Sequence, residues 1–274
     1  MRNKRTRSRL TVVSVVLVVA LVGGGLLLRS ALEGGGGGTA AGPPCRVGTF
    51  GLDLEQAANA TTIAGVGKRL GVPDHAVSIA LATALLESNL RNLTHGDRDS
   101  LGLFQQRPSQ GWGTPTQILT PQHAATSFYQ HLVRVPGWEV IPVTDAAQRV
   151  QRSALPNSYA HFEPKARALA IALTGEAPAG FTCQVAVPVT PPAPGALTQA
   201  MASELGLRSL AIALGPERGW TVASWMVGHA IPFRIVSVAY AGQRWTAAQG
   251  RWISDPAVGT EVEVVRVPAA AAAA

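Results

Sequence analysis

The chain has 274 residues, of which 47% are hydrophobic and 14% charged, and its formal net charge is +7. This length allows one sizeable folded core and a second, smaller domain. Five of the seven net positive charges lie in the first nine residues, so the rest carries only two. The rest of the chain is therefore nearly neutral, and we predict no nucleic-acid partner.

The N-terminal region has the pattern of a membrane-inserted segment. No charged residue occurs from Leu10 to Leu28, a stretch long enough to cross a bilayer as a helix. The basic residues 1–9 before it would remain in the cytoplasm and direct the following chain outside. A signal peptide cleaved near residues 39–41 is the alternative. We therefore predict a single-pass membrane protein, or a secreted one, whose folded part is extracytoplasmic.

Two linkers divide the remainder. Residues 29–44 include five consecutive glycines and end in two prolines, and residues 187–195 contain four prolines. Such compositions form spacers rather than cores. They predict one domain over residues 45–186 and an accessory domain over residues 196–268.

The two cysteines of the chain lie near the ends of the first predicted domain. A disulfide between Cys45 and Cys183 would form in an oxidising compartment and would close a long loop. In the chain-entropy model such a loop stabilises the fold by roughly 4 to 5 kcal/mol. Two unrelated buried thiols are the alternative.

Apolar residues recur at helical intervals through most of the first domain. The pattern breaks between Thr94 and Gly113, where Gly, Asp, Ser, Gln and Pro predict a long loop. The spacing predicts helices over residues 54–70, 74–93, 121–135, 144–153 and 164–173.

The accessory domain has a mixed pattern. Residues 197–214 and 220–230 suit helices, whereas three segments rich in β-branched residues, 235–240, 251–254 and 260–267, suit strands. The predicted fold class is thus α+β: an N-terminal transmembrane helix, a mainly α-helical domain and a small α/β accessory domain. Four tryptophans are predicted to form the accessory core rather than a carbohydrate-binding face: Trp220, Trp225, Trp245 and Trp252.

One carboxylate lies in an otherwise apolar helix. Glu87 is the only charged residue between Asp74 and Arg91. Burial would raise the pKa of its carboxyl toward the range useful for a general acid near neutral pH. An ion pair with Arg91 one turn later is the structural alternative.

The surroundings of Glu87 resemble those in a known superfamily. The segment Leu86-Glu87-Ser88-Asn89-Leu90 precedes Ser100-Leu101-Gly102-Leu103-Phe104-Gln105-Gln106 and then Gly111-Trp112-Gly113. Over residues 54–173 this is similar to soluble lytic transglycosylases and goose-type lysozymes, in particular a secreted actinobacterial type. The resemblance implies a helical lysozyme-like domain with a groove for the glycan strands of peptidoglycan.

The resemblance also implies roles for individual residues. Glu87 would be the catalytic acid/base, helped in its orientation by Ser88, and Tyr159 would lie close to the carboxyl. Ser100 and Gln105 would bind the sugar. Trp112, between two glycines, is either a sugar-stacking face or part of the core.

The mechanism depends on whether a second carboxylate takes part. A muramidase-type hydrolase would need one, which Asp97 or Asp99 could supply unless they only form a solvated turn. A lytic transglycosylase needs only Glu87, and this is the favoured interpretation. A non-catalytic wall-binding protein is the other alternative. The histidines lack metal-ligand spacing, and we predict no metal or cofactor.

Overall fold

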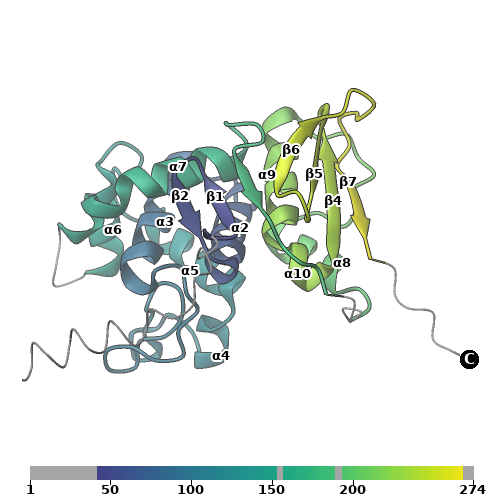
Figure 1. The fold of residues 1–274 in the computed structure, drawn as a ribbon. Helices are drawn as coiled ribbons and strands as arrows, with labels where there is room; N and C mark the ends of the chain where they lie inside the picture. Colours follow the sequence, from purple (N-terminus) through teal and green to yellow (C-terminus); the bar gives the residue numbers. More distant parts are fainter. Residues whose placement is uncertain (1–41, 153–156, 189–192, 268–274) are drawn as a thin grey trace, which may run out of the picture. The chain divides into compact units, whose positions relative to one another are not determined.

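The computed structural model describes residues 42–152, 157–188 and 193–267 of the chain (Figure 1). The residues from Pro43 onward form one compact unit. Its first half is mainly helical, as predicted. The helical segments there are α2 (Leu54–Arg69), α3 (Asp74–Ser88), η1 (Pro108–Gln110), α4 (Pro115–Ile118), α5 (Pro121–Leu132), α6 (Val143–Gln151), η2 (Ser158–Phe162) and α7 (Glu163–Thr174).

The end of α3 differs from the prediction and fixes the position of Glu87. The helix begins at Asp74 as expected but ends at Ser88 rather than at Leu93. Asn89 and Leu90 adopt left-handed backbone conformations, with φ of 53° and 60°. Asparagine tolerates this conformation better than most residues and commonly ends helices. Glu87 therefore lies in the last turn of α3, next to the long loop that follows.

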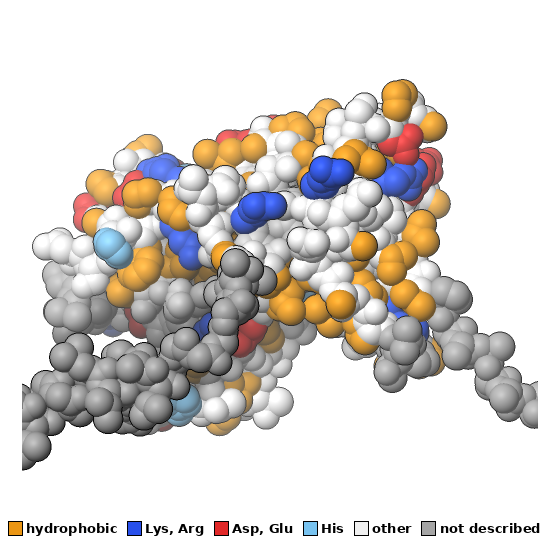
Figure 2. Space-filling model, viewed as in Figure 1, with side chains coloured by type: hydrophobic (Ala, Val, Ile, Leu, Met, Phe, Trp, Pro, Cys, Tyr) orange, Lys and Arg blue, Asp and Glu red, His pale blue; other side chains and the backbone are white. Residues whose placement is uncertain are grey.

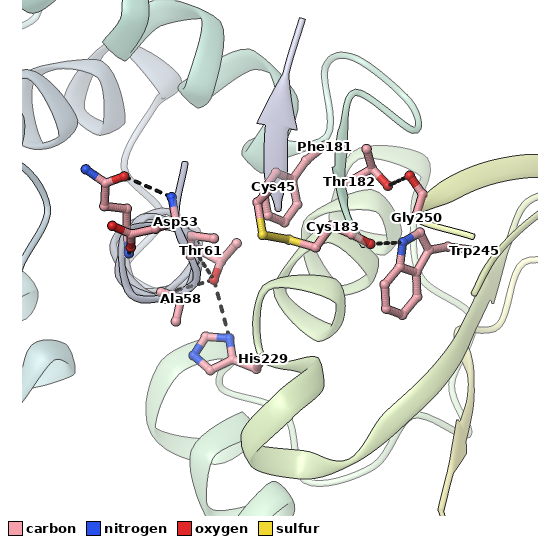
Figure 3. The surroundings of a disulfide bond; sticks show 12 residues. Cys45, Asp53, Ala58, Thr61, Phe181, Thr182, Cys183, His229, Trp245 and Gly250 are labelled. Carbon is pink, nitrogen blue, oxygen red and sulfur yellow. Dashed lines mark hydrogen bonds between the residues drawn. A yellow bond between two sulfur atoms is a disulfide. The ribbon is translucent and has the colours of Figure 1, made fainter. Parts of the chain in front are cut away.

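A small sheet that the sequence patterns did not predict joins the two ends of the helical part. It contains β1 (Cys45–Val47), β2 (Phe50–Leu52) and β3 (Phe181–Cys183), in the antiparallel order β2-β1-β3. Cys45 lies directly opposite Cys183 in this sheet, and the two form the predicted disulfide (Figure 3). The disulfide prediction is confirmed.

The second half contains helices and a four-stranded antiparallel sheet in the order β6-β5-β4-β7. The strand predictions at 235–240 and 251–254 are confirmed. The strand over residues 243–246 was not predicted. The helix predicted over 197–214 ends at Leu205. The elements are α8 (Ala196–Ala200), a π-helical turn η3 (Met201–Leu205), α9 (Pro216–Gly228), α10 (Ala230–Phe233), β4 (Ile235–Tyr240), β5 (Gln243–Thr246), β6 (Arg251–Ser254) and β7 (Glu263–Arg266).

The tryptophans of the second half pack inward. Trp220, Trp225 and Trp245 are buried, and Trp252 is half-buried against Trp220, with ring centroids 5.1 Å apart. Trp252 donates a hydrogen bond from Nε1 to the carbonyl of Phe181, and Trp245 donates one to the carbonyl of Cys183. These contacts confirm that the tryptophans form core and not an open carbohydrate face.

The two halves share one core. Helix α9 packs against α2 and α7 of the first half as well as against β4 of its own sheet. At Gly175, which ends α7 with φ of 96°, a Cβ atom would lie 2.1 Å from the carbonyl oxygen of Glu217, so only glycine fits this approach. The domain boundary at residues 187–195, part of which lies outside the described residues, stays a prediction.

The predicted fold class needs correction. Within residues 42–152, 157–188 and 193–267, no helix is long and apolar enough to cross a membrane. The segment from Leu10 to Leu28, predicted as a transmembrane helix, lies outside the described residues. What the structure shows is an α+β fold with two small antiparallel sheets, one of them within the part predicted to be helical.

On the face shown in Figure 2, lysine and arginine side chains are scattered among apolar and uncharged ones. They do not form one continuous basic stripe on that face. This distribution agrees with the near-neutral charge of the chain beyond its first nine residues.

A buried polar cluster connects the two halves. Glu204 of η3 accepts hydrogen bonds at Oε2 from Thr62 Oγ1 of α2 (2.6 Å) and from Trp225 Nε1 of α9 (2.8 Å). His229, at the end of α9, lies 3.3 Å from both Thr61 and Thr62 (Figure 3 shows the Thr61 contact). Glu204 and His229 are each only 8% exposed, so their hydrogen bonds replace those to water.

We expect this cluster to make stability depend on pH. Burial lowers the pKa of His229, because the imidazolium form is poorly solvated there. The unfolded chain binds the same proton near pH 6.5, so acidification below that value favours unfolding. Between pH 7.5 and pH 5, the free energy of unfolding should fall by roughly 1 kcal/mol more in the parent than in His229→Gln.

Urea denaturation at both pH values measures this difference. His161→Gln, a change at an exposed histidine, should behave like the parent. Equal pH dependence of the parent and His229→Gln would contradict the expectation.

Candidate functional site

Glu87 is half-buried at the end of α3, and its carboxylate has polar partners on η2 and α6. The hydroxyl of Tyr159, which lies on η2, donates a hydrogen bond of 2.8 Å to Glu87 Oε1. Tyr159 is fully buried, so its ring is held by packing. The structure thus brings together two of the predicted site residues that are 72 positions apart in the sequence.

The surroundings of Glu87 shift its pKa in opposing directions. Burial raises the pKa of the carboxyl, and hydrogen bonds from Tyr159 and Gln151 lower it; the net shift is upward. Gln151 ends α6 and donates a further hydrogen bond of 2.7 Å from Nε2 to the carbonyl of Phe104. Arg91 does not pair with Glu87 but forms salt bridges with Asp53 and Glu55. The alternative in which Glu87 forms an ion pair with Arg91 one turn later is therefore wrong.

Tyr159→Phe is expected to change the pH profile of any reaction in which Glu87 donates a proton. The hydroxyl stabilises the carboxylate, so its removal raises the pKa of Glu87 further. The alkaline limb of the kcat/KM profile should move upward by about one pH unit, since a hydrogen bond to a charged group contributes about 1.5 kcal/mol or more. An unmoved limb would show that this hydrogen bond does not tune Glu87.

The loop after α3 is fixed to the helix by its backbone. Ser88 is buried, and its Oγ donates hydrogen bonds to the carbonyls of Leu103 (2.7 Å) and Ala84 (3.1 Å). Leu101 and Gln106 form an isolated β-bridge around Gly102. A Cβ atom at Gly102, whose φ is 74°, would lie 2.7 Å from the carbonyl oxygen of Ile118. Through its hydrogen bond to the carbonyl of Leu103, Ser88 acts as a positioning residue for the loop.

The two predicted sugar-binding residues of the loop, Ser100 and Gln105, differ in how far they are exposed. Ser100 is buried, and its backbone N–H donates to the carbonyl of Asp97. Gln105 lines a surface pocket, and its Nε2 donates a hydrogen bond of 3.2 Å to the carbonyl of Gly102. Phe104 is fully buried and stacks on Phe128, so it belongs to the core.

The two candidate second carboxylates have other surroundings. The side chain of Asp97 is 91% exposed and lies near Arg98. Asp99 forms a 2.7 Å salt bridge with Arg107 and accepts a hydrogen bond from the backbone N–H of Ser109. These contacts hold the pKa of Asp99 well below its usual range. Asp97 thus faces solvent, and the carboxylate of Asp99 is engaged by Arg107 and Ser109.

A pocket of about 500 Å³ opens beside this region. It is lined by two of the predicted residues, Gln105 and Trp112, and by Gln151, which also contacts Glu87. The indole of Trp112 stacks on the imidazole of His131, with ring centroids 3.9 Å apart. Trp112 is thus partly packed and partly a pocket wall, which combines the two alternatives for this residue.

Two residues of the site were not predicted. Gln151 lies in the predicted helix over residues 144–153, but nothing in its spacing indicates that it faces Glu87. His131 lies four residues after Ser127, to whose carbonyl it hydrogen-bonds, and only the structure places it against Trp112. In the described residues, no group of three or more His, Cys, Asp or Glu side chains is placed to hold a metal ion.

Comparison with known proteins adds no identification. Neither a protein-family model nor a curated protein matches the chain. The lysozyme-like resemblance therefore rests on the residues around Glu87.

Proposed function

We propose that this protein cleaves the glycan strand of peptidoglycan as a lytic transglycosylase, with Glu87 as its acid/base. The observation that carries the proposal is the half-buried carboxyl of Glu87, whose pKa is raised by burial and which is held by Tyr159 next to a pocket. A carboxyl in this environment retains its proton at higher pH than an exposed one, as a general acid requires.

The reaction uses Glu87 twice. Its protonated carboxyl first donates a proton to the glycosidic oxygen as the bond from C1 of the muramic acid residue breaks. The resulting carboxylate then accepts the proton of the C6 hydroxyl of the same sugar, whose oxygen bonds to C1. An anhydro ring forms, no water is consumed, and Glu87 regains its proton. The hydrogen bond from Tyr159 stabilises the carboxylate between the two steps.

The surroundings favour a transglycosylase over a hydrolase. A hydrolase needs a second carboxylate as nucleophile or base for water. Asp97 faces solvent and Asp99 is engaged by Arg107.

The proposed site of action is outside the cytoplasm. The disulfide between Cys45 and Cys183 supports this, because such bonds persist in oxidising compartments. Peptidoglycan also lies there, so substrate and enzyme would share a compartment.

The test is digestion of purified peptidoglycan by the full-length chain, followed by mass spectrometry of the released fragments. We expect muropeptides with anhydromuramic ends, lighter by one water than those a hydrolase releases. Reducing ends would support the hydrolase alternative instead. Binding to peptidoglycan without any released fragment would favour the non-catalytic alternative and overturn the proposal.

A further inference from the structure

The pocket beside Glu87 is strongly cationic. Four arginines line it, Arg107, Arg134, Arg149 and Arg152, together with His131. No described lining residue is acidic. Like charges gathered in a concave site raise the local potential and attract anions.

Three of these guanidinium groups have no acidic partner in the described part of the chain. Arg107 forms a salt bridge with Asp99, but no carboxylate there lies within 4 Å of Arg134, Arg149 or Arg152. Arg149 donates a hydrogen bond to the backbone carbonyl of Pro136, which leaves its charge uncompensated. All three side chains belong to exposed residues.

The rest of the pocket suits a ligand that is part of a glycan strand. The Trp112–His131 pair provides an aromatic wall, and Gln105 and Gln151 provide amide groups. Gln151 also contacts Glu87, so it links the pocket to the proposed reacting carboxyl, which does not itself line the pocket. A volume of about 500 Å³ is within the range for sites that hold a small ligand.

We propose that this arginine pocket binds the carboxylates of the peptide stem attached to the glycan, so that the protein prefers strands whose stems carry free carboxylates. The inference rests on the proposed function. The sugars of the strand and their acetamido groups are neutral, so they cannot compensate the arginines. A stem peptide with several free carboxylates can, because guanidinium groups bind carboxylates through paired, charge-assisted hydrogen bonds.

The test is a binding measurement with a matched pair of ligands. The full-length Glu87→Gln variant, which prevents turnover, is titrated calorimetrically with a disaccharide tetrapeptide whose carboxylates are free and with the same compound fully amidated. We expect the amidated ligand to bind about tenfold more weakly. The preference should shrink as salt is added, since it is electrostatic.

Two variants test whether the preference for free carboxylates arises in the pocket. Arg134→Gln/Arg149→Gln, made in the same background, should bind both ligands with nearly equal affinity. Arg251→Gln removes an exposed arginine of β6 that does not line the pocket, and it should retain the preference.

Equal affinity of the unsubstituted pocket for the two ligands would overturn the inference, as would a preference that survives the double substitution. A glycerol phosphate oligomer that binds more tightly than the free-acid ligand would also overturn it and would indicate a phosphate ligand. If peptidoglycan digestion succeeds while the ligand pair is not distinguished, only the arginine pocket is assigned wrongly. If digestion fails, the proposed function itself fails.

Discussion

Glu87→Gln is expected to lower the rate of peptidoglycan cleavage by roughly 10³-fold, within the range that general acid–base catalysis contributes. Glutamine has nearly the same shape and its amide oxygen can still accept the hydrogen bond from Tyr159. It cannot donate a proton to the glycosidic oxygen or accept one from the C6 hydroxyl. Both steps of the proposed reaction therefore lose their proton carrier.

The measurement is the initial rate of soluble muropeptide release by the full-length parent and variant at equal concentration. Thermal unfolding of both proteins checks that the fold is retained. Asp97→Asn is the matched control, since it neutralises a carboxylate that is exposed in the loop after α3. Parent-like activity of Glu87→Gln would rule out the proposed role of Glu87, whereas a large loss in Asp97→Asn would favour the hydrolase alternative.

The helical part of the fold was predictable because its signals are local. The spacing of apolar residues indicated both α3 and α5. The end of α3 was predicted too late because the apolar residues Leu90 and Leu93 continue the pattern. The left-handed backbone at Asn89, which ends the helix, has only a weak sequence signal.

The small sheet and the shared core depend on contacts that are distant in the sequence. Strands β1, β2 and β3 have three residues each, too few to show an alternating pattern. The packing of α9 against α2 brings together residues separated by more than a hundred positions. Local periodicity carries no information about such pairings.

The candidate site likewise contains residues that have a sequence signal and residues that have none. Glu87 became a candidate because an unusual carboxylate in an apolar helix coincides with the family resemblance, and Tyr159 through the resemblance alone. Gln151 and His131 have no local signal, since a polar residue at a helix end usually faces solvent. Their roles emerge only when α6 and α5 are placed around the loop after α3.

Replacing both cysteines by alanine is expected to lower the free energy of unfolding by about 5 kcal/mol in the chain-entropy model, because the bond joins positions 138 residues apart. For a chain of this size the loss corresponds to a fall in Tm of about 10–20 °C. Alanine suits both positions, since Cys45 and Cys183 are buried and serine would bury a hydroxyl there.

The effect should reach the second half of the fold. Trp245 of β5 donates its Nε1 hydrogen bond to the carbonyl of Cys183, so loosening β3 also removes support from the second sheet (Figure 3). Scanning calorimetry of the parent with and without a thiol reductant, and of Cys45→Ala/Cys183→Ala, measures this. The reductant should destabilise the parent to the level of the double variant and leave the variant unchanged. Removing so long a cross-link frees the whole unfolded segment between β1 and β3. A Tm of the double variant within about 2 °C of that of the oxidised parent would therefore contradict the expected loss.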